Sequence, residues 1–102
     1  MLKIGQVENK NQFYYEDGFK SVFQSYNSII VIYQNGKLIF GRDWDYSKTT
    51  LKHLYIYLND YLRLYGFRYR EELYKALKSN NRRKALQKMI DNGQIEYDCD
   101  LK

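Results

Sequence analysis

The sequence predicts a single α+β domain, in which an N-terminal antiparallel β-meander of about four strands is followed by three helices and a C-terminal strand. Strand-like patterns fill the first 42 residues, apolar residues recur at helical spacing from Leu51 onward, and residues 94–101 alternate again. A chain of 102 residues is near the commonest domain size, so we expect one domain. It would comprise the β-meander at 1–46, a helical part at 47–93 and a closing strand at 94–102.

The first half of the chain is expected to form strands joined by tight turns. Asn35-Gly36 separates two apolar runs and is the strongest short hairpin signal, because a type I′ turn needs two positive φ angles. Asp17-Gly18 predicts a weaker turn of the same kind, and the run SIIVIYQ is typical of a strand covered on both faces. The predicted strands are 12–16, 19–26, 28–34 and 37–42, with an edge strand at 2–7.

A first helix is predicted from the spacing of the apolar residues after the meander. They fall at i, i+3, i+4, i+7, i+11 and i+14, which is one stripe of an α-helix: Leu51, Leu54, Tyr55, Leu58, Leu62 and Tyr65. Gly66 follows as the expected end. At the start, Ser47, Thr49 and Thr50 are each N-cap candidates, and Asp45 would favour the positive end of the helix dipole.

Residues 44–53, WDYSKTTLKH, also raise a catalytic alternative, because a carboxylate, hydroxyls, amines and the chain's only imidazole lie close together. A serine nucleophile needs a base within hydrogen-bond reach, a third group that orients the base, and an oxyanion site. Ser47 and His53 lie at opposite ends of the first helical turns, no Gly-rich loop is nearby, and His53 is expected to face away from the apolar stripe. Helix capping explains this stretch without chemistry, so we predict no catalytic residue and no enzyme.

Two further helices are predicted at 69–79 and 82–91. Asn80-Asn81 separates them, and Gly93 stands just past the end of the second. The tail QIEYDCDL alternates apolar and acidic residues, which predicts a half-buried strand that closes onto the sheet. In this interpretation Cys99 is a small core residue.

No cofactor, metal site or membrane segment is predicted. The single Cys and the single His match no zinc or calcium ligand spacing. No apolar run approaches the roughly 18 residues that span a bilayer, and the first residues lack the apolar core of a signal peptide. We therefore expect a cytosolic protein.

Positive charge is concentrated in one segment of the chain. The net charge is +5, and residues 63–92 hold nine Lys or Arg against three Asp or Glu. Arginines interleaved with tyrosines suit phosphates and unpaired bases, and the same residue types anchor protein partners. A solvated face whose tyrosines complete the core is the third interpretation. The residues expected to contact a partner are Arg63, Tyr65, Arg68, Tyr69, Arg70, Tyr74, Lys78, Arg82, Arg83, Lys84 and Lys88.

The stretch SYNSIIVIYQNGKLIFGRDWDYSKTTLKH resembles a family of small phage and plasmid proteins with the pattern S-Y-x-(S/T)-x-I, a hairpin, and then W-D-Y-S-x-T-T-x-K/H. The resemblance covers roughly residues 5–60. The same stretch is also similar to a module of some small anti-CRISPR proteins. These are phage inhibitors of type II RNA-guided nucleases and act by binding without catalysis. The resemblance implies a partner in the bacterial host cell: a defence protein or its nucleic-acid complex. It assigns no binding residues, because the basic segment lies outside it.

We therefore expect a phage-type anti-defence protein that inhibits a host RNA-guided nuclease or another defence complex by stoichiometric binding through the basic segment. A protein target is favoured over nucleic acid, because the acidic residues Glu96, Asp98 and Asp100 would repel phosphate if they lay beside that segment. The alternative is a small DNA- or RNA-binding protein or transcriptional regulator. It would use residues 69–91 as a helix-turn-helix-like element, with Arg82 and Arg83 at the start of the recognition helix.

Overall fold

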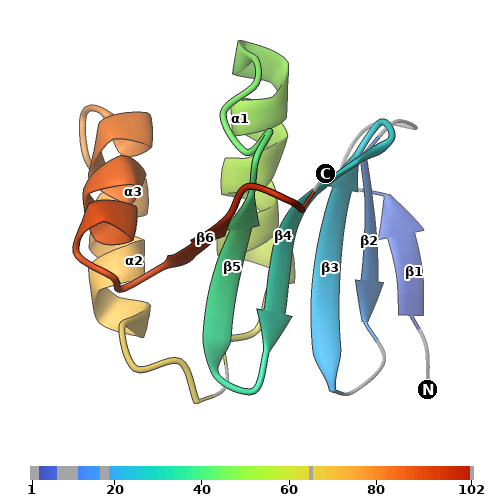
Figure 1. Cartoon of the computed structure of the whole chain (residues 1–102), viewed down its shortest axis with the longest axis horizontal. Coiled ribbons are helices and arrows are strands. Elements are labelled where there is room, and N and C mark those ends of the chain that lie inside the picture. The colour runs from blue at the N-terminus through green and yellow to red at the C-terminus, as the bar shows by residue number, and fades with distance from the viewer. Residues whose placement is uncertain (1–2, 7–11, 17–18, 65, 102) are drawn as a thin grey trace.

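The computed structural model describes residues 3–6, 12–16, 19–64 and 66–101, and these form one six-stranded sheet with helices packed against it (Figure 1). The strands follow the chain order across the sheet, with antiparallel pairing from β1 to β5 and parallel pairing of β6 with β5. The predicted α+β class and the N-terminal meander are thus confirmed. The strands are β1 (Lys3–Gln6), β2 (Gln12–Glu16), β3 (Lys20–Ser25), β4 (Ser28–Gln34), β5 (Lys37–Gly41) and β6 (Glu96–Asp98).

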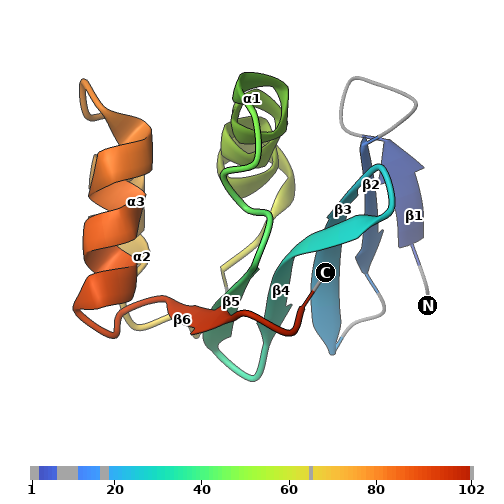
Figure 2. The ribbon, with the colours of Figure 1, turned by 45° about the horizontal axis from the view of Figure 1, so that its top comes forward.

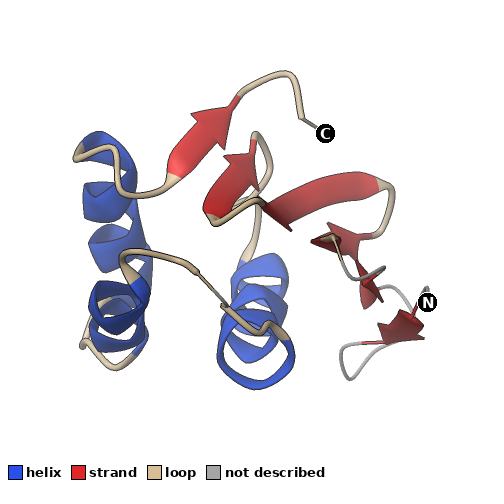
Figure 3. Ribbon diagram, turned by 90° about the horizontal axis from the view of Figure 1, so that it is seen from below, coloured by secondary structure: helices blue, strands red, loops and turns tan. Residues whose placement is uncertain are grey.

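The helical part lies between β5 and β6 in sequence and packs mainly against one side of the sheet. It consists of α1 (Lys48–Ile56), a π-helical turn (Tyr57–Tyr61), α2 (Arg70–Leu77) and α3 (Arg82–Asp91). Figures 2 and 3 show the sheet curving around α1, with α2 and α3 together on the side of α1 away from β1 and β2. No helix in the described ranges is long and apolar enough to cross a bilayer.

The core forms where the concave face of the sheet meets α1. Phe23, Val31 and Phe40 are in register across β3, β4 and β5, so their side chains share one face, and all three are fully buried. Tyr57 stacks on Phe23 with ring centroids 5.0 Å apart. Strand alternation in the meander and the burial of Tyr57 therefore bring α1 and its π-helical extension onto the sheet.

The first helix ends earlier than predicted. Instead of continuing to Gly66, the helical chain stops at Tyr61, and Leu62 is extended at φ −80° and ψ 128°. Leu62 and Leu64 are nevertheless buried, and Phe67 packs edge-on against Tyr33 with ring centroids 6.1 Å apart. The apolar residues after 61 thus enter the core from an irregular segment. Their spacing in the sequence is the same as that of a longer helix, so the sequence did not show where the helix ends.

The hairpin turn at Asn35-Gly36 is confirmed, because both residues have positive φ angles, at 55° and 74°. The edge strand expected at 2–7 is present as β1. The turn predicted at Asp17-Gly18 lies outside the described residues.

The tail is not the half-buried strand that its alternation predicts. β6 pairs with β5 as expected, but it spans only three residues and is exposed on both faces. The chain then turns, with Leu101 N–H donating to Asp98 O at 3.1 Å, so the alternation ends before Cys99. The prediction that Cys99 is a core residue is wrong, since its side chain is exposed.

Candidate functional site

The basic side chains predicted as contacts are exposed. Two of them, Lys78 and Arg82, line a groove between α1, α2 and α3. We call this hollow of about 240 Å³ the interhelical groove. Its main lining residues are Lys52, Tyr55, Ile56, Leu77, Lys78 and Arg82, and Asn59 and Asp60 complete it. Three cations therefore meet there, one from α1, one at the end of α2 and one at the start of α3.

Tyr55 forms an aromatic wall of the groove. The Arg82 guanidinium lies over its ring, 4.3 Å from the centroid, which is a cation–π arrangement. Burial raises the pKa of Tyr55 above its usual value, and the nearby charges of Arg82 and Arg83 oppose that rise in part. The tyrosine is thus neutral at physiological pH, and its half-buried ring holds Arg82 beside the groove.

Lys52 is a groove residue that was not predicted from the sequence. It lies in the nearly neutral first part of the chain, so the charge of residues 63–92 gave no reason to include it. Its spacing of three and seven residues from Tyr55 and Asn59 places all three on one side of the helical segment. That spacing can be read from the sequence. The position of Lys52 beside Lys78 and Arg82, however, depends on how α2 and α3 pack against α1.

Arg83 binds another side chain of the protein, the Asp45 carboxylate. Its Nε and Nη2 donate to Oδ2 of Asp45 at 3.1 and 2.8 Å, and its guanidinium lies 6.0 Å from the centroid of the Trp44 ring. Lys84 and Lys88, by contrast, are exposed and have no ion pair with any described residue. Arg83 is therefore less available to a partner than its neighbours on α3.

The remaining predicted contacts do not form one surface with the groove. Arg63 lines a separate hollow with Phe19 and Gly36, at the β4–β5 turn. Arg68 and Arg70 lie before and at the start of α2, and Tyr69 and Tyr74 are half-buried against the core. Part of each tyrosine ring thus packs on the core, as the interpretation of a solvated basic face predicts. Tyr65 lies outside the described residues.

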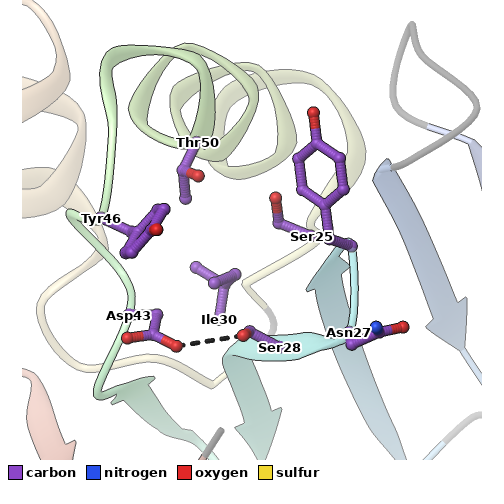
Figure 4. A pocket seen from close by; sticks show the side chains of 8 residues that line it. Ser25, Asn27, Ser28, Ile30, Asp43, Tyr46 and Thr50 are labelled. Atoms are coloured by element: carbon purple, nitrogen blue, oxygen red, sulfur yellow. Dashed lines mark hydrogen bonds between the residues drawn. The ribbon is translucent and has the colours of Figure 1, made fainter.

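A third hollow, of about 370 Å³, lies between the β3–β4 turn and the start of α1 (Figure 4). We call it the turn pocket, and its polar lining comes mainly from Ser25, Tyr26, Ser28, Asp43, Tyr46 and Thr50. Ser28 Oγ donates to Asp43 Oδ2 at 3.0 Å, which joins the two strand ends across the pocket. None of these residues was predicted as a contact, although Ser25–Ile30 and Trp44–Thr50 are the two halves of the pattern that carries the resemblance.

Two buried polar side chains, one of which lines the turn pocket, have no hydrogen-bond partner among the described residues. Ser25 is only 3% exposed, and its Oγ has no hydrogen-bond partner among the described residues. Gln12 lies directly opposite Ser25 in the β2–β3 register, is fully buried, and has neither amide atom paired with any described residue. A buried polar group left unpaired costs about 1–3 kcal/mol, so both side chains are expected to bind a water or a ligand group.

The stretch 44–53 begins α1, and its cap is Ser47. Thr50 N–H donates to Ser47 Oγ at 3.1 Å, which confirms the capping prediction and selects one of the three candidates. His53 does not face outward as expected, because it is buried and donates from Nδ1 to Thr49 O at 2.8 Å. The face that α1 buries includes Thr50, His53 and Leu54. It is rotated from the predicted stripe, whose Tyr55 lies at the interhelical groove instead.

Within the described ranges, no group of three or more His, Cys, Asp or Glu side chains is placed to hold a metal ion.

Comparison with protein families gives one result. The model of a family described as "Family of unknown function (DUF8033)" matches residues 2–88. The chain belongs to this family. The matched region contains every residue that lines the interhelical groove or the turn pocket, and it ends before β6. No curated protein and no solved structure matches the chain significantly.

Proposed function

We propose that this protein is a phage-type anti-defence protein that binds a nucleic-acid-containing host defence complex in the bacterial cytoplasm, without catalysis. The observation that carries the proposal is the meeting of Lys52, Lys78 and Arg82 at the interhelical groove. Guanidinium and ammonium groups are the usual protein donors to phosphate oxygens. The sequence resemblance points to an RNA-guided nuclease or a similar defence complex, and the groove supports contact with its nucleic acid.

The charge around the groove suits a polyanion. Among the described residues that line it, Asp60 is the one acidic residue, against three cations. The acidic tail, which favoured a purely protein target, follows the opposite end of α3 from Arg82. A ten-residue helix is about 15 Å long, and Glu96 already pairs with Lys37 at 3.8 Å. The tail therefore gives little reason to exclude phosphate from the groove.

A second candidate is a DNA- or RNA-binding regulator that uses residues 69–91 as a helix-turn-helix-like element. It is favoured by the short connection between α2 and α3 and by the Asn81 side chain, which caps α3 by accepting from Lys84 N–H at 3.1 Å. Arg82 and Arg83 then occupy the first turn of the second helix, where base contacts are usual. Arg83 is held by the Asp45 carboxylate, which makes this candidate the weaker one.

The test compares binding and inhibition by the parent protein and by groove variants. A pull-down from host lysate, with and without nuclease treatment, identifies the complex, and the purified complex is then used for titration. We expect Lys52→Glu and Lys78→Glu each to weaken binding at least tenfold and to reduce the salt dependence, because each removes a phosphate contact.

Lys75→Glu is the matched control, since Lys75 is an exposed cation of α2 that does not line the groove. It should bind within about twofold of the parent. If the groove variants inhibit as well as the parent, the proposal is wrong. Equal affinity for free DNA and for the defence complex would instead support the regulator.

A further inference from the structure

We propose that the turn pocket receives one unpaired base of the bound nucleic acid, with guanine preferred. This inference rests on the proposed function, because the phosphates of the same strand would lie on the basic surface of the helices. The pocket volume of about 370 Å³ is at the small end of the range for ligand sites, roughly 300–1,000 Å³, and suits one planar ring system.

The electrostatics of the turn pocket exclude an anion as its direct occupant. Among the described residues that line it, Asp43 is the only charged one, and the others carry hydroxyl, amide, aromatic or aliphatic side chains. A phosphate would therefore meet a carboxylate without a compensating cation. A neutral group that donates hydrogen bonds fits this lining, and a base is such a group.

Two exposed tyrosines supply faces on which a base can stack. Tyr46 is 78% exposed and Tyr26 is 55% exposed, and both line the pocket. Tyr26 is held at φ 54°, a left-handed conformation uncommon for a bulky residue, while Gln24 Nε2 donates to its carbonyl oxygen at 2.8 Å. This angle belongs to the two-residue turn between Ser25 and Ser28, and base–aromatic stacking is the common mode of single-strand recognition.

Hydrogen-bonding capacity remains free at the walls of the pocket. Asp43 uses one oxygen to accept from Ser28, so the carboxylate retains lone pairs that can accept more donors. Guanine presents its ring N1–H and its exocyclic N2–H side by side, which matches a carboxylate as an acceptor pair. Ser25 Oγ is buried, lines the pocket and has no described partner, so it can serve the same ligand. Figure 4 shows Ser25, Thr50, Tyr46 and Asp43 arranged around the opening.

The pocket is physically joined to the basic helices. Tyr46 follows Asp45, whose carboxylate is 2.8 Å from Arg83 at the start of α3. A strand with one base in the pocket would therefore leave it close to Arg83. The same proximity opposes an arginine-containing peptide, which could also stack and bind Asp43, because the surrounding cations would repel it.

The experiment measures fluorescence anisotropy with two labelled single-stranded DNA decamers, one of thymidine only and one with a single central guanine. We expect the guanine decamer to bind at least fivefold more tightly. Tyr46→Ala should weaken its binding about fivefold or more, and Asp43→Asn should abolish the preference between the two decamers. Tyr97→Ala is the matched control, because Tyr97 is a 48% exposed tyrosine on β6, outside the pocket, and binding should not change.

Other outcomes separate this inference from the proposed function. Lys52→Glu should weaken both decamers by the same factor. If the decamers bind equally, Tyr46→Ala has no effect and Lys52→Glu still weakens binding, the pocket proposal is overturned and the groove proposal stands. Displacement of the decamer by free guanosine would support the pocket as a base site, whereas binding of an arginine-containing peptide in place of either decamer would overturn it. Ser25→Ala should weaken guanine binding without lowering the melting temperature.

Discussion

Arg83 and Asp45, 38 residues apart in the sequence, are joined by two hydrogen bonds from the guanidinium to one carboxylate oxygen. The contact ties the first turn of α3 to the segment that precedes α1. It lies between the interhelical groove and the turn pocket, so the packing of α3 determines how the two candidate surfaces are placed relative to each other. Reversing the charge of Arg83 would therefore alter the fold locally as well as any partner contact.

The first prediction concerns this ion pair. Arg83→Ala and Asp45→Ala should each lower the free energy of unfolding by at most about 1 kcal/mol, because the pair is partly exposed and screened by solvent. The double variant should lose less than the sum of the two single losses. Urea unfolding of the four proteins measures this coupling. Strict additivity would mean that the contact contributes nothing to stability.

The second prediction concerns the cap of α1. Ser47→Ala should lower the free energy of unfolding by about 1 kcal/mol, because Thr50 N–H would lose its acceptor. Thr49→Ala is the matched control, since the exposed Thr49 side chain does not cap the helix. Partner binding should survive at temperatures where Ser47→Ala remains folded. A folded Ser47→Ala protein without any activity would argue against a purely capping role.

The third prediction concerns the β4–β5 turn. Gly36→Val should destabilise the protein by more than 1 kcal/mol, by about the cost of a strained backbone residue, because a β-branched residue resists a φ of 74°. An added Cβ would also lie 3.0 Å from the carbonyl oxygen of Gly66. Asn35→Gly should be tolerated, since glycine adopts positive φ readily. Thermal unfolding compares the variants, and a Gly36→Val protein as stable as the parent would contradict the turn geometry.

The fourth prediction concerns alkaline pH. Burial raises the pKa of Tyr57 above its usual value, although its hydroxyl is hydrogen-bonded to Ser21. Above about pH 10 the unfolded chain loses the Tyr57 proton while the folded protein retains it, so stability should fall as the pH rises. The contribution is fully present below that pH.

Tyr57→Phe separates this effect from general alkaline unfolding. The variant should be less stable than the parent at pH 8, because Ser21 loses its partner, but its stability should fall less between pH 9 and pH 11. Tyr46→Phe, at an exposed position, should keep the parental pH dependence. Identical slopes for Tyr57→Phe and the parent, measured by urea unfolding, would refute the role assigned to Tyr57.

The elements predicted correctly are those whose signals are local. Asn35-Gly36 defines its hairpin through the φ angles that only certain residues accept, and α3 spans Arg82–Asp91, as the interruption at Asn80-Asn81 and the position of Gly93 predict. The end of the first helix and the tail were predicted less well. In both places the apolar residues keep the helical or strand spacing although the regular backbone has ended, at Leu62 and after Asp98.

The candidate surfaces divide in the same way. The positive charge of residues 63–92 is a property of composition, so the sequence alone identifies it. Composition cannot show that Arg63 lies away from the groove, that Lys52 joins it, or that Arg83 is held by Asp45. These facts depend on which helix faces pack together, which follows from the burial of side chains far apart in the chain.

The sequence by itself determined the α+β class, the meander with its turn at Asn35-Gly36, the start of α1 and the basic character of the helical part. These features follow from backbone preferences, capping and the periods of helices and strands, all of which act over a few residues. Only the tertiary structure decided the turn pocket, because Ser25 and Tyr46 come together when the curved sheet closes around α1. The sheet closes around α1 because this buries apolar surface, and that driving force acts between segments far apart in the sequence, so no local pattern predicts the pocket.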